Sequence, residues 1–341
     1  MKTKLMVFLS VIMLVVTTAF GAEIKPVDVH FIDTGNSDSI LIVDNDKFAL
    51  IDGADNNDEQ LLVDYLNKQG VEELEYLILT HPDADHCGGL DAVVKNFAIK
   101  NVFIGNGDAD SKTYQDFINA CMAKKLQPSI PLVDKTFKLG NGNFKFYNQK
   151  ANSKDVNDNS LVTLYTNGTT NYLFMGDAGA DVEKALPLKE IGKVNVLKVG
   201  HHGSKTSSSD EFIKAVAPKY AIICCGKDNE YGHPHKETIS VLNNYKVCTF
   251  KTDVDGTIVI TSNGKNVSSK TKLSDIQSTS DTSQNIALNK EVVYITKSGK
   301  KYHNEGCESL NESKIKITKN EAEAKGYTYC KKCFNVVKYQ K

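Results

Sequence analysis

The stretch THPDADHCGG, from Thr80 to Gly89, places two histidines, two aspartates and a cysteine within ten residues. It follows the apolar run EYLIL (75–79), which is typical of a buried strand. A buried strand is usually followed by an ordinary turn and not by a cluster of ionisable groups, because such groups are costly to bury without partners. Four side chains of this turn are of the kinds that bind zinc, manganese or iron: His81, Asp83, Asp85 and His86.

The spacing of these four side chains predicts two metal ions rather than one. Alternate residues at a strand end point the same way, so His81 and Asp83 share one side, and the following turn directs Asp85 and His86 elsewhere. Four ligands from so short a segment are hard to arrange around a single ion. The alternative interpretation is a polar loop whose side chains satisfy one another.

Further candidate ligands follow other apolar runs. Asp177 ends the run NYLFMGD in a turn flanked by glycines, and His201 and His202 follow VNVLKVG in the same way. A single Asp after a strand is also a common turn residue or helix cap, whereas a pair of histidines there favours metal binding. The segment YGHPH adds His233 and His235, which either contact a substrate or open the next helix.

The rest of the chain alternates short strands with helices in two halves. Strand patterns occur at 27–33, 39–44, 48–53 and 74–80, and again at 144–149, 160–167, 170–178, 194–200, 220–226 and 256–262. Helical patterns occur at 58–68, 90–97, 114–124, 210–216 and 235–244. We see no sequence repeat. This order predicts two packed sheets, or one split sheet, with helices outside.

The runs VHFIDTGNSDSILI, THPDADHCGGL, NYLFMGDA, VLKVGHHGSKTS and GKDNEYGHPH occur in this order. Together they resemble the metallo-β-lactamase fold, and more specifically the hydrolase domain of the ComEC-type competence proteins. The resemblance covers residues 25–262 and implies an αββα sandwich with a two-metal site at one edge. In this branch an Asp, here Asp83, stands where β-lactamases usually carry a His. The loop DTGNSDS departs from the family's Gly-Gln-Gly-Asp pattern.

The resemblance also implies how the ligands divide between two divalent ions, zinc or manganese. His81 and Asp83 would hold one ion and Asp85 and His86 the other. Asp177 would bridge the two ions, and His201 or His202 would complete the shell. Two adjacent ions lower the pKa of a water that they share, so a hydroxide is available at neutral pH and hydrolysis is the expected reaction class.

Three residues have expected catalytic roles. Asp85 would orient the attacking water or accept its proton, and His201 or His233 would protonate the leaving group or stabilise its charge. A covalent serine mechanism has no support, because neither Ser-x-x-Lys nor Gly-x-Ser-x-Gly occurs.

Three functions compete on these observations. The first is a secreted phosphodiesterase or nuclease acting on DNA or a small phosphodiester. The second is a lactone, thioester or other carbonyl hydrolase on the same scaffold, with Asp83 arguing against a β-lactam substrate. The third is a non-catalytic, metal-containing surface-binding protein. All 41 cationic residues are Lys, so a phosphate clamp here would use Lys, backbone amides or metal rather than Arg.

The first 22 residues, MKTKLMVFLSVIMLVVTTAFGA, have the order of a secretory signal peptide: lysines, an apolar stretch and small residues. We therefore expect a secreted or cell-surface protein, with an uncleaved N-terminal anchor as the alternative. No later run is apolar enough to cross a bilayer, so no integral membrane domain is expected after cleavage.

The chain is expected to end in a separate module at 290–341, after a linker at 263–289 that is rich in Ser, Thr and Asn. Its candidate ligands form two close pairs that predict a structural zinc site: His303, Cys307, Cys330 and Cys333. A disulfide among the cysteines is the alternative. The module resembles the small Ada-type metal-binding domain, with His303 in place of the first Cys, so alkyl repair is not implied. Residues 288–341 contain 12 Lys and 6 Glu, which suits contact with DNA or a cell-surface polymer.

Overall fold

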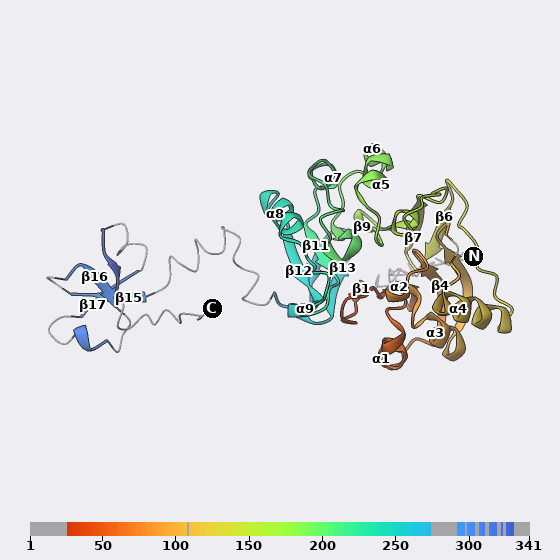
Figure 1. The fold of residues 1–341 in the computed structure, drawn as a ribbon, viewed down its shortest axis with the longest axis horizontal. Helices are drawn as coiled ribbons and strands as arrows, with labels where there is room; N and C mark the ends of the chain where they lie inside the picture. The colour runs from red at the N-terminus through yellow and green to blue at the C-terminus, as the bar shows by residue number, and fades with distance from the viewer. Residues whose placement is uncertain are drawn as a thin grey trace, which may run out of the picture.

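The computed structural model describes residues 26–107 and 109–273, followed by parts of the C-terminal module (Figure 1). In that module the described residues are 292–296, 299–303, 307–310, 314–318, 322 and 325–330. The predicted signal peptide (1–22), most of the predicted linker and Cys333 lie outside the described residues.

The first sheet has seven strands in the order β14-β13-β1-β2-β3-β4-β5. Its strands are β1 (Val27–Phe31), β2 (Ile40–Asp44), β3 (Lys47–Ile51), β4 (Glu73–Leu79), β5 (Ala98–Ile104), β13 (Ile258–Ser262) and β14 (Val267–Ser269). Strands β3, β4 and β5 are parallel, and the other pairs are antiparallel. The parallel connections need crossovers, which α1 (Glu59–Lys68) and α3 (Leu90–Asn96) provide.

The second sheet also has seven strands, in the order β12-β11-β10-β9-β8-β7-β6. Its strands are β6 (Thr136–Leu139), β7 (Gly142–Tyr147), β8 (Val162–Asn167), β9 (Thr170–Phe174), β10 (Val196–Lys198), β11 (Tyr220–Ile223) and β12 (Cys248–Lys251). Strands β9 to β12 are parallel. Their crossovers contain α5 (Ala180–Ala185) and α6 (Leu188–Ile191), then α7 (Asp210–Val216), then α8 (Lys236–Asn244). Each sheet thus joins antiparallel hairpins to a parallel βα portion.

The remaining elements complete the domain. They are η1 (Asn56–Asp58), α2 (Ala84–Cys87), α4 (Lys112–Ala123), η2 (Asn157–Asn159), η3 (Gly200–Gly203) and α9 (Thr252–Asp255). Within the described residues, no helix combines the length and the apolar composition needed to cross a membrane.

Three apolar layers hold the sandwich together. The central layer lies between the sheets and contains Phe31, Phe144 and Phe174, which are fully or almost fully buried. A second layer packs the outer face of the first sheet against α1, α3 and α4, and a third packs the second sheet against α5, α7 and α8. Helices therefore cover both outer faces (Figure 1). The predicted αββα metallo-β-lactamase sandwich is confirmed.

The predicted helices and central strands are also confirmed, but four edge strands were not predicted. Strands β5, β6, β12 and β14 lie at sheet edges, where only part of each strand is buried, so their sequences lack a continuous apolar run. The predicted domain boundary at 262 is wrong, because the edge strand β14, which was not predicted, lies beyond it. β14 pairs with β13, and Thr271 also hydrogen-bonds to Val259, so the domain extends at least to Thr271.

The C-terminal module contains a four-stranded sheet in the order β17-β15-β16-β18. Its elements are β15 (Val292–Ile295), β16 (Lys301–His303), η4 (Glu308–Leu310), β17 (Ile315–Thr318) and β18 (Thr328–Tyr329). The buried apolar cluster in its described part is small: Val293, Ile295, Tyr302 and Ala322. Stabilisation of this module by a metal ion stays a prediction.

Candidate metal centre

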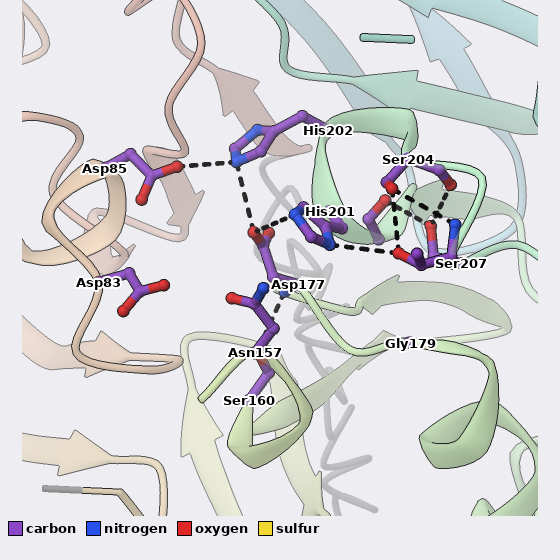
Figure 2. A network of polar contacts seen from close by, with 12 residues as sticks. Asp83, Asp85, Asn157, Ser160, Asp177, Gly179, His201, His202, Ser204 and Ser207 are labelled. Carbon is purple, nitrogen blue, oxygen red and sulfur yellow. Dashed lines mark hydrogen bonds and ion pairs between the residues drawn. The ribbon is translucent and has the colours of Figure 1, made fainter. Parts of the chain in front are cut away.

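The predicted ligands come together where strands of the two sheets end. β4 ends at Leu79 in the first sheet, and the THPDADH turn follows it. In the second sheet β9 ends at Phe174, shortly before Asp177, and β10 ends at Lys198, shortly before His201 and His202. Figure 2 shows Asp85 facing His202, with the carboxylate of Asp177 between His202 and His201. Residues far apart in the sequence thus form one site.

Four side chains form the centre of this site. Asp85, His86, Asp177 and His202 each offer one ligand atom, and these atoms lie within 4.8 Å of one another. Asp177 Oδ1 is 3.2 Å from His86 Nε2, and its Oδ2 is 3.6 Å from His202 Nε2. Asp85 Oδ2 is 3.2 Å from His202 Nε2. Asp177 therefore lies between His86 and His202.

His81, Asp83 and His201 flank this centre. The rings of His81 and His86 have centroids 4.2 Å apart, and His81 Nε2 is 3.7 Å from Asp83 Oδ2. His201 Nε2 is 3.8 Å from Asp177 Oδ2. His81 is buried, whereas the Asp83 side chain is 46% exposed and that of His201 is 26% exposed. All seven predicted ligands of this domain therefore lie around one centre.

Buried polar atoms without hydrogen bonds indicate that the residues around Asp177 suit a metal ion. His81 Nε2, His86 Nε2 and Asp177 Oδ1 are buried and make no well-aligned hydrogen bond within the described part of the chain, although His86 Nε2 and Asp177 Oδ1 form an ion-pair contact at 3.2 Å. A buried polar atom that stays unsatisfied costs about 1–3 kcal/mol. All three face the centre, and imidazole nitrogen and carboxylate oxygen both ligate divalent ions. The donor set fits the predicted metal ions.

Asp52 orients His86 and was missed by sequence reasoning. His86 Nδ1 is 2.8 Å from Asp52 Oδ2, and the amide of Thr80 donates to Asp52 Oδ1 at 2.7 Å. This bond fixes the imidazole so that Nε2 faces the centre, as carboxylate partners of metal-binding histidines usually do. Asp52 follows β3 and precedes Gly53, so the strand-end argument applied to Asp177 would have found it too.

Asp38 and Lys198 form a second buried support that the sequence did not reveal. Lys198 Nζ is 2.7 Å from Asp38 Oδ2, and neither side chain is more than 1% exposed. Asp38 Oδ1 lies 3.5 Å from His202 Nδ1, which contacts the carbonyl of Cys224 at 2.9 Å. Burial disfavours the ammonium, but Asp38 outweighs this effect and raises the pKa of Lys198. Lys198 therefore stays protonated beneath the centre.

The charges of the centre favour two ionised carboxylates. Burial opposes ionisation of Asp177, but His202 and His86 hold its pKa well below the usual range. Burial likewise opposes ionisation of Asp85, but His86 and a hydrogen bond with His202 lower its pKa to about 2. Both groups are therefore anionic at neutral pH, which is the form that binds cations.

The backbone at His201 and His202 is left-handed, with φ of 50° at both residues. This conformation costs about 1–2 kcal/mol for each residue with a Cβ atom. The surrounding fold retains it between Gly200 and Gly203, and it directs both imidazoles toward Asp177. Strain of this kind, kept by the fold, is typical of functional sites.

His233 lies on the outer side of the centre. Its ring centroid is 5.4 Å from that of His201 and 6.2 Å from that of His202. Burial, followed by the charges of His202 and His201, lowers its pKa to about 4. His233 is therefore neutral at pH 7. His235 lies beside it and accepts a hydrogen bond from the amide of Lys205 through Nδ1 at 3.1 Å.

A second cluster lies in the C-terminal module. His303, Cys307 and Cys330 each offer one ligand atom, and these atoms lie within 4.8 Å of one another. His303 Nδ1 is 3.2 Å from Cys307 Sγ. Cys333, the fourth predicted ligand, lies outside the described residues. Three of the four predicted ligands are thus neighbours, while zinc binding and the Ada-type resemblance stay predictions.

Comparisons with known proteins agree with this geometry. The family model of the metallo-beta-lactamase superfamily matches residues 32–144. ComE operon protein 3 of Bacillus subtilis is 32% identical over 204 residues, covering 59% of this chain and 26% of that protein. Recombination protein 2 of Haemophilus influenzae is 30% identical over 236 residues, covering 67% of this chain and 28% of that protein. The chain thus spans less than a third of the length of these relatives.

Among solved structures, the metallo-β-lactamase fold protein YhfI from Bacillus subtilis aligns with a TM-score of 0.49 and 12% identity. The alignment covers 70% of this chain and all of that one. The family match, the αββα sandwich and the competence-protein relatives together identify the domain. The chain belongs to the metallo-β-lactamase superfamily and carries a domain of the ComEC competence-protein type.

Proposed function

We propose that this chain is a metal-dependent hydrolase of phosphodiester bonds, with DNA as the expected substrate. The main support is the cluster of Asp85, His86, Asp177 and His202, whose ligand atoms lie within 4.8 Å of one another. Relatives named for competence and recombination favour a nucleic acid over a carbonyl substrate. Export by the first 22 residues and contact with DNA or a surface polymer through the basic tail complete the proposal.

The proposed site uses the metal ligands predicted from the sequence. His81, Asp83, Asp85, His86 and Asp177, with His201 or His202, would hold two divalent ions, zinc or manganese. When bound, such ions polarise a phosphoryl oxygen and lower the pKa of water. Asp85 is 34% exposed and ionised, so its free oxygen is available to accept a proton from an attacking water.

His201 and His233 lie where a leaving group would depart. Burial lowers the pKa of both imidazoles, so each is neutral at pH 7. A neutral imidazole stabilises a developing oxyanion by donating an N–H hydrogen bond. This role fits the two residues better than transfer of a proton from an imidazolium, which was the other role expected from the sequence.

The test is cleavage of labelled single- and double-stranded DNA and of bis-p-nitrophenyl phosphate by the purified chain, with zinc or manganese. We expect metal-dependent cleavage that Asp177→Ala abolishes. Asp181→Ala is the matched control, because that carboxylate lies four residues on in α5 and is 90% exposed. Metal-loaded protein that cleaves none of these substrates would refute the proposal. A lactone and nitrocefin panel then tests the carbonyl alternative.

A further inference from the structure

An exposed aromatic ring stands beside the metal centre and has no role in the core. Tyr231 is 61% exposed. Its ring centroid is 5.6 Å from that of His233, and the two planes are 22° apart. One face of the tyrosine thus lies against His233. Because most of the residue is exposed, the other face is open to solvent.

The rings of Tyr231, His233 and His202 form a stack that leads to the centre. His233 is nearly parallel to His202, with an interplanar angle of 23° and centroids 6.2 Å apart. His202 Nε2 is within 3.6 Å of both Asp85 and Asp177. A flat group stacked on the outer face of Tyr231 would be separated from His202, a proposed metal ligand, by the rings of Tyr231 and His233.

The loop that carries Tyr231 is held by its own hydrogen bonds. Asn229 Nδ2 donates to the carbonyls of Gly226 at 2.8 Å and His233 at 2.6 Å. The amide of His233 donates back to Asn229 Oδ1 at 2.9 Å. Gly232 has a φ of +70°, which lets the chain turn between Tyr231 and His233. The loop backbone that carries the ring is therefore preorganised, which reduces the entropy lost on binding.

We propose that Tyr231 is a stacking platform for a nucleobase next to the scissile phosphodiester, so that single-stranded nucleic acid is the preferred substrate. This inference rests on the proposed function and specifies its substrate class. Bases in a single strand offer a free face to an aromatic side chain, whereas those in a duplex are stacked on their neighbours. The absence of Arg and Trp from the chain leaves Tyr, Phe and His for this contact.

The test compares a single-stranded oligothymidylate with an abasic deoxyribose-phosphate oligomer of equal length. We expect Tyr231→Ala to lower kcat/KM on the thymidylate about ten-fold, the low end of a base–aromatic stack, and to leave the abasic oligomer unaffected. Tyr231→Phe should behave as the wild type, because it keeps the ring. Leu132→Ala, which removes another exposed apolar side chain, is the control.

Binding of the same two oligomers in EDTA, measured by fluorescence anisotropy, separates this inference from the proposed function. If the wild type cleaves neither oligomer, the phosphodiesterase proposal fails, and the binding comparison still decides the role of Tyr231. An equal effect of Tyr231→Ala on both oligomers, or no effect on either, would overturn the platform.

Discussion

The two predicted metal-binding clusters, one around Asp177 and one with His303, differ in how much of the surrounding fold supports them. The centre around Asp177 stands at the ends of strands in two seven-stranded sheets, and Asp52, Asp38 and Lys198 support it from behind. The cluster of His303 and Cys307 instead belongs to a module whose described apolar core is small. In the hydrolase domain, the folded sheets hold the ligands in place. In the C-terminal module, a bound metal would instead stabilise the fold.

The ligand chemistry differs in the same sense. Carboxylates and imidazoles around Asp177 suit several divalent ions, so the metal there is expected to be exchangeable between zinc and manganese. Thiolates favour zinc, and a structural zinc site contributes directly to folding. The comparison therefore predicts a catalytic metal whose removal leaves the hydrolase domain folded, and a structural metal whose removal unfolds the C-terminal module.

Chelation should give the largest difference between the two regions. With EDTA at neutral pH, we expect amide hydrogens of β15 and β16 to lose protection, because structural zinc contributes about 10–16 kcal/mol to small zinc-binding modules. Amides of β1, β9 and β10 should stay protected, since large apolar layers hold those strands. Hydrogen exchange followed by mass spectrometry measures both regions in one sample.

Cys307→Ser is the specific form of this experiment. It should remove protection in the module while metal is present and leave the hydrolase domain unchanged. Protection of β15 and β16 that survives both the chelator and the substitution would mean that the module folds without metal, and the comparison would fail.

Breaking the buried ion pair should give the next largest effect. Lys198→Met removes the ammonium and leaves the Asp38 carboxylate buried without its partner, which should cost about 3–5 kcal/mol of unfolding free energy. The double variant Asp38→Asn/Lys198→Met should recover most of this loss, because neither charge remains. Urea unfolding measures both. A cost for Lys198→Met within the range of an exposed pair, about 0–1 kcal/mol, would show that the scaffold does not depend on this pair.

The sequence predicted the residues that face the candidate metal centre, but not the residues that support those candidate ligands from behind. His81, Asp83, Asp85 and His86 share one turn, and Asp177, His201 and His202 each follow an apolar run, so ligand type and position point to one chemistry. Lys198 lies in β10, which has a strand on each side. A lone Lys within an apolar run usually faces solvent, and only the tertiary arrangement reveals that this one is buried. Asp38 lies in a polar loop, and again only the tertiary arrangement reveals that its side chain is buried.

The edge strands show a related limit. β5, β6, β12 and β14 are only partly buried, so the apolar pattern that identified the central strands is weak in them. Their pairing is decided by neighbouring strands distant in the sequence. In contrast, the helix predicted at 58–68 is confirmed as α1, because Leu62, Val63 and Leu66 give it a continuous apolar face.

Asp52→Asn should give the smallest effect and tests whether the hydrolase centre is positioned by its protein surroundings. The substitution keeps the size of the side chain but removes the negative charge that faces His86 Nδ1 at 2.8 Å. A neutral amide orients the imidazole less firmly and makes Nε2 a weaker ligand, so zinc affinity should fall about 10–100-fold. Competition with a chromophoric chelator measures that affinity without reference to catalysis. Asp181→Asn, at an exposed position of α5, should leave it unchanged. If Asp52→Asn lowers the unfolding free energy but not the zinc affinity, Asp52 supports the fold through Thr80 rather than the metal through His86.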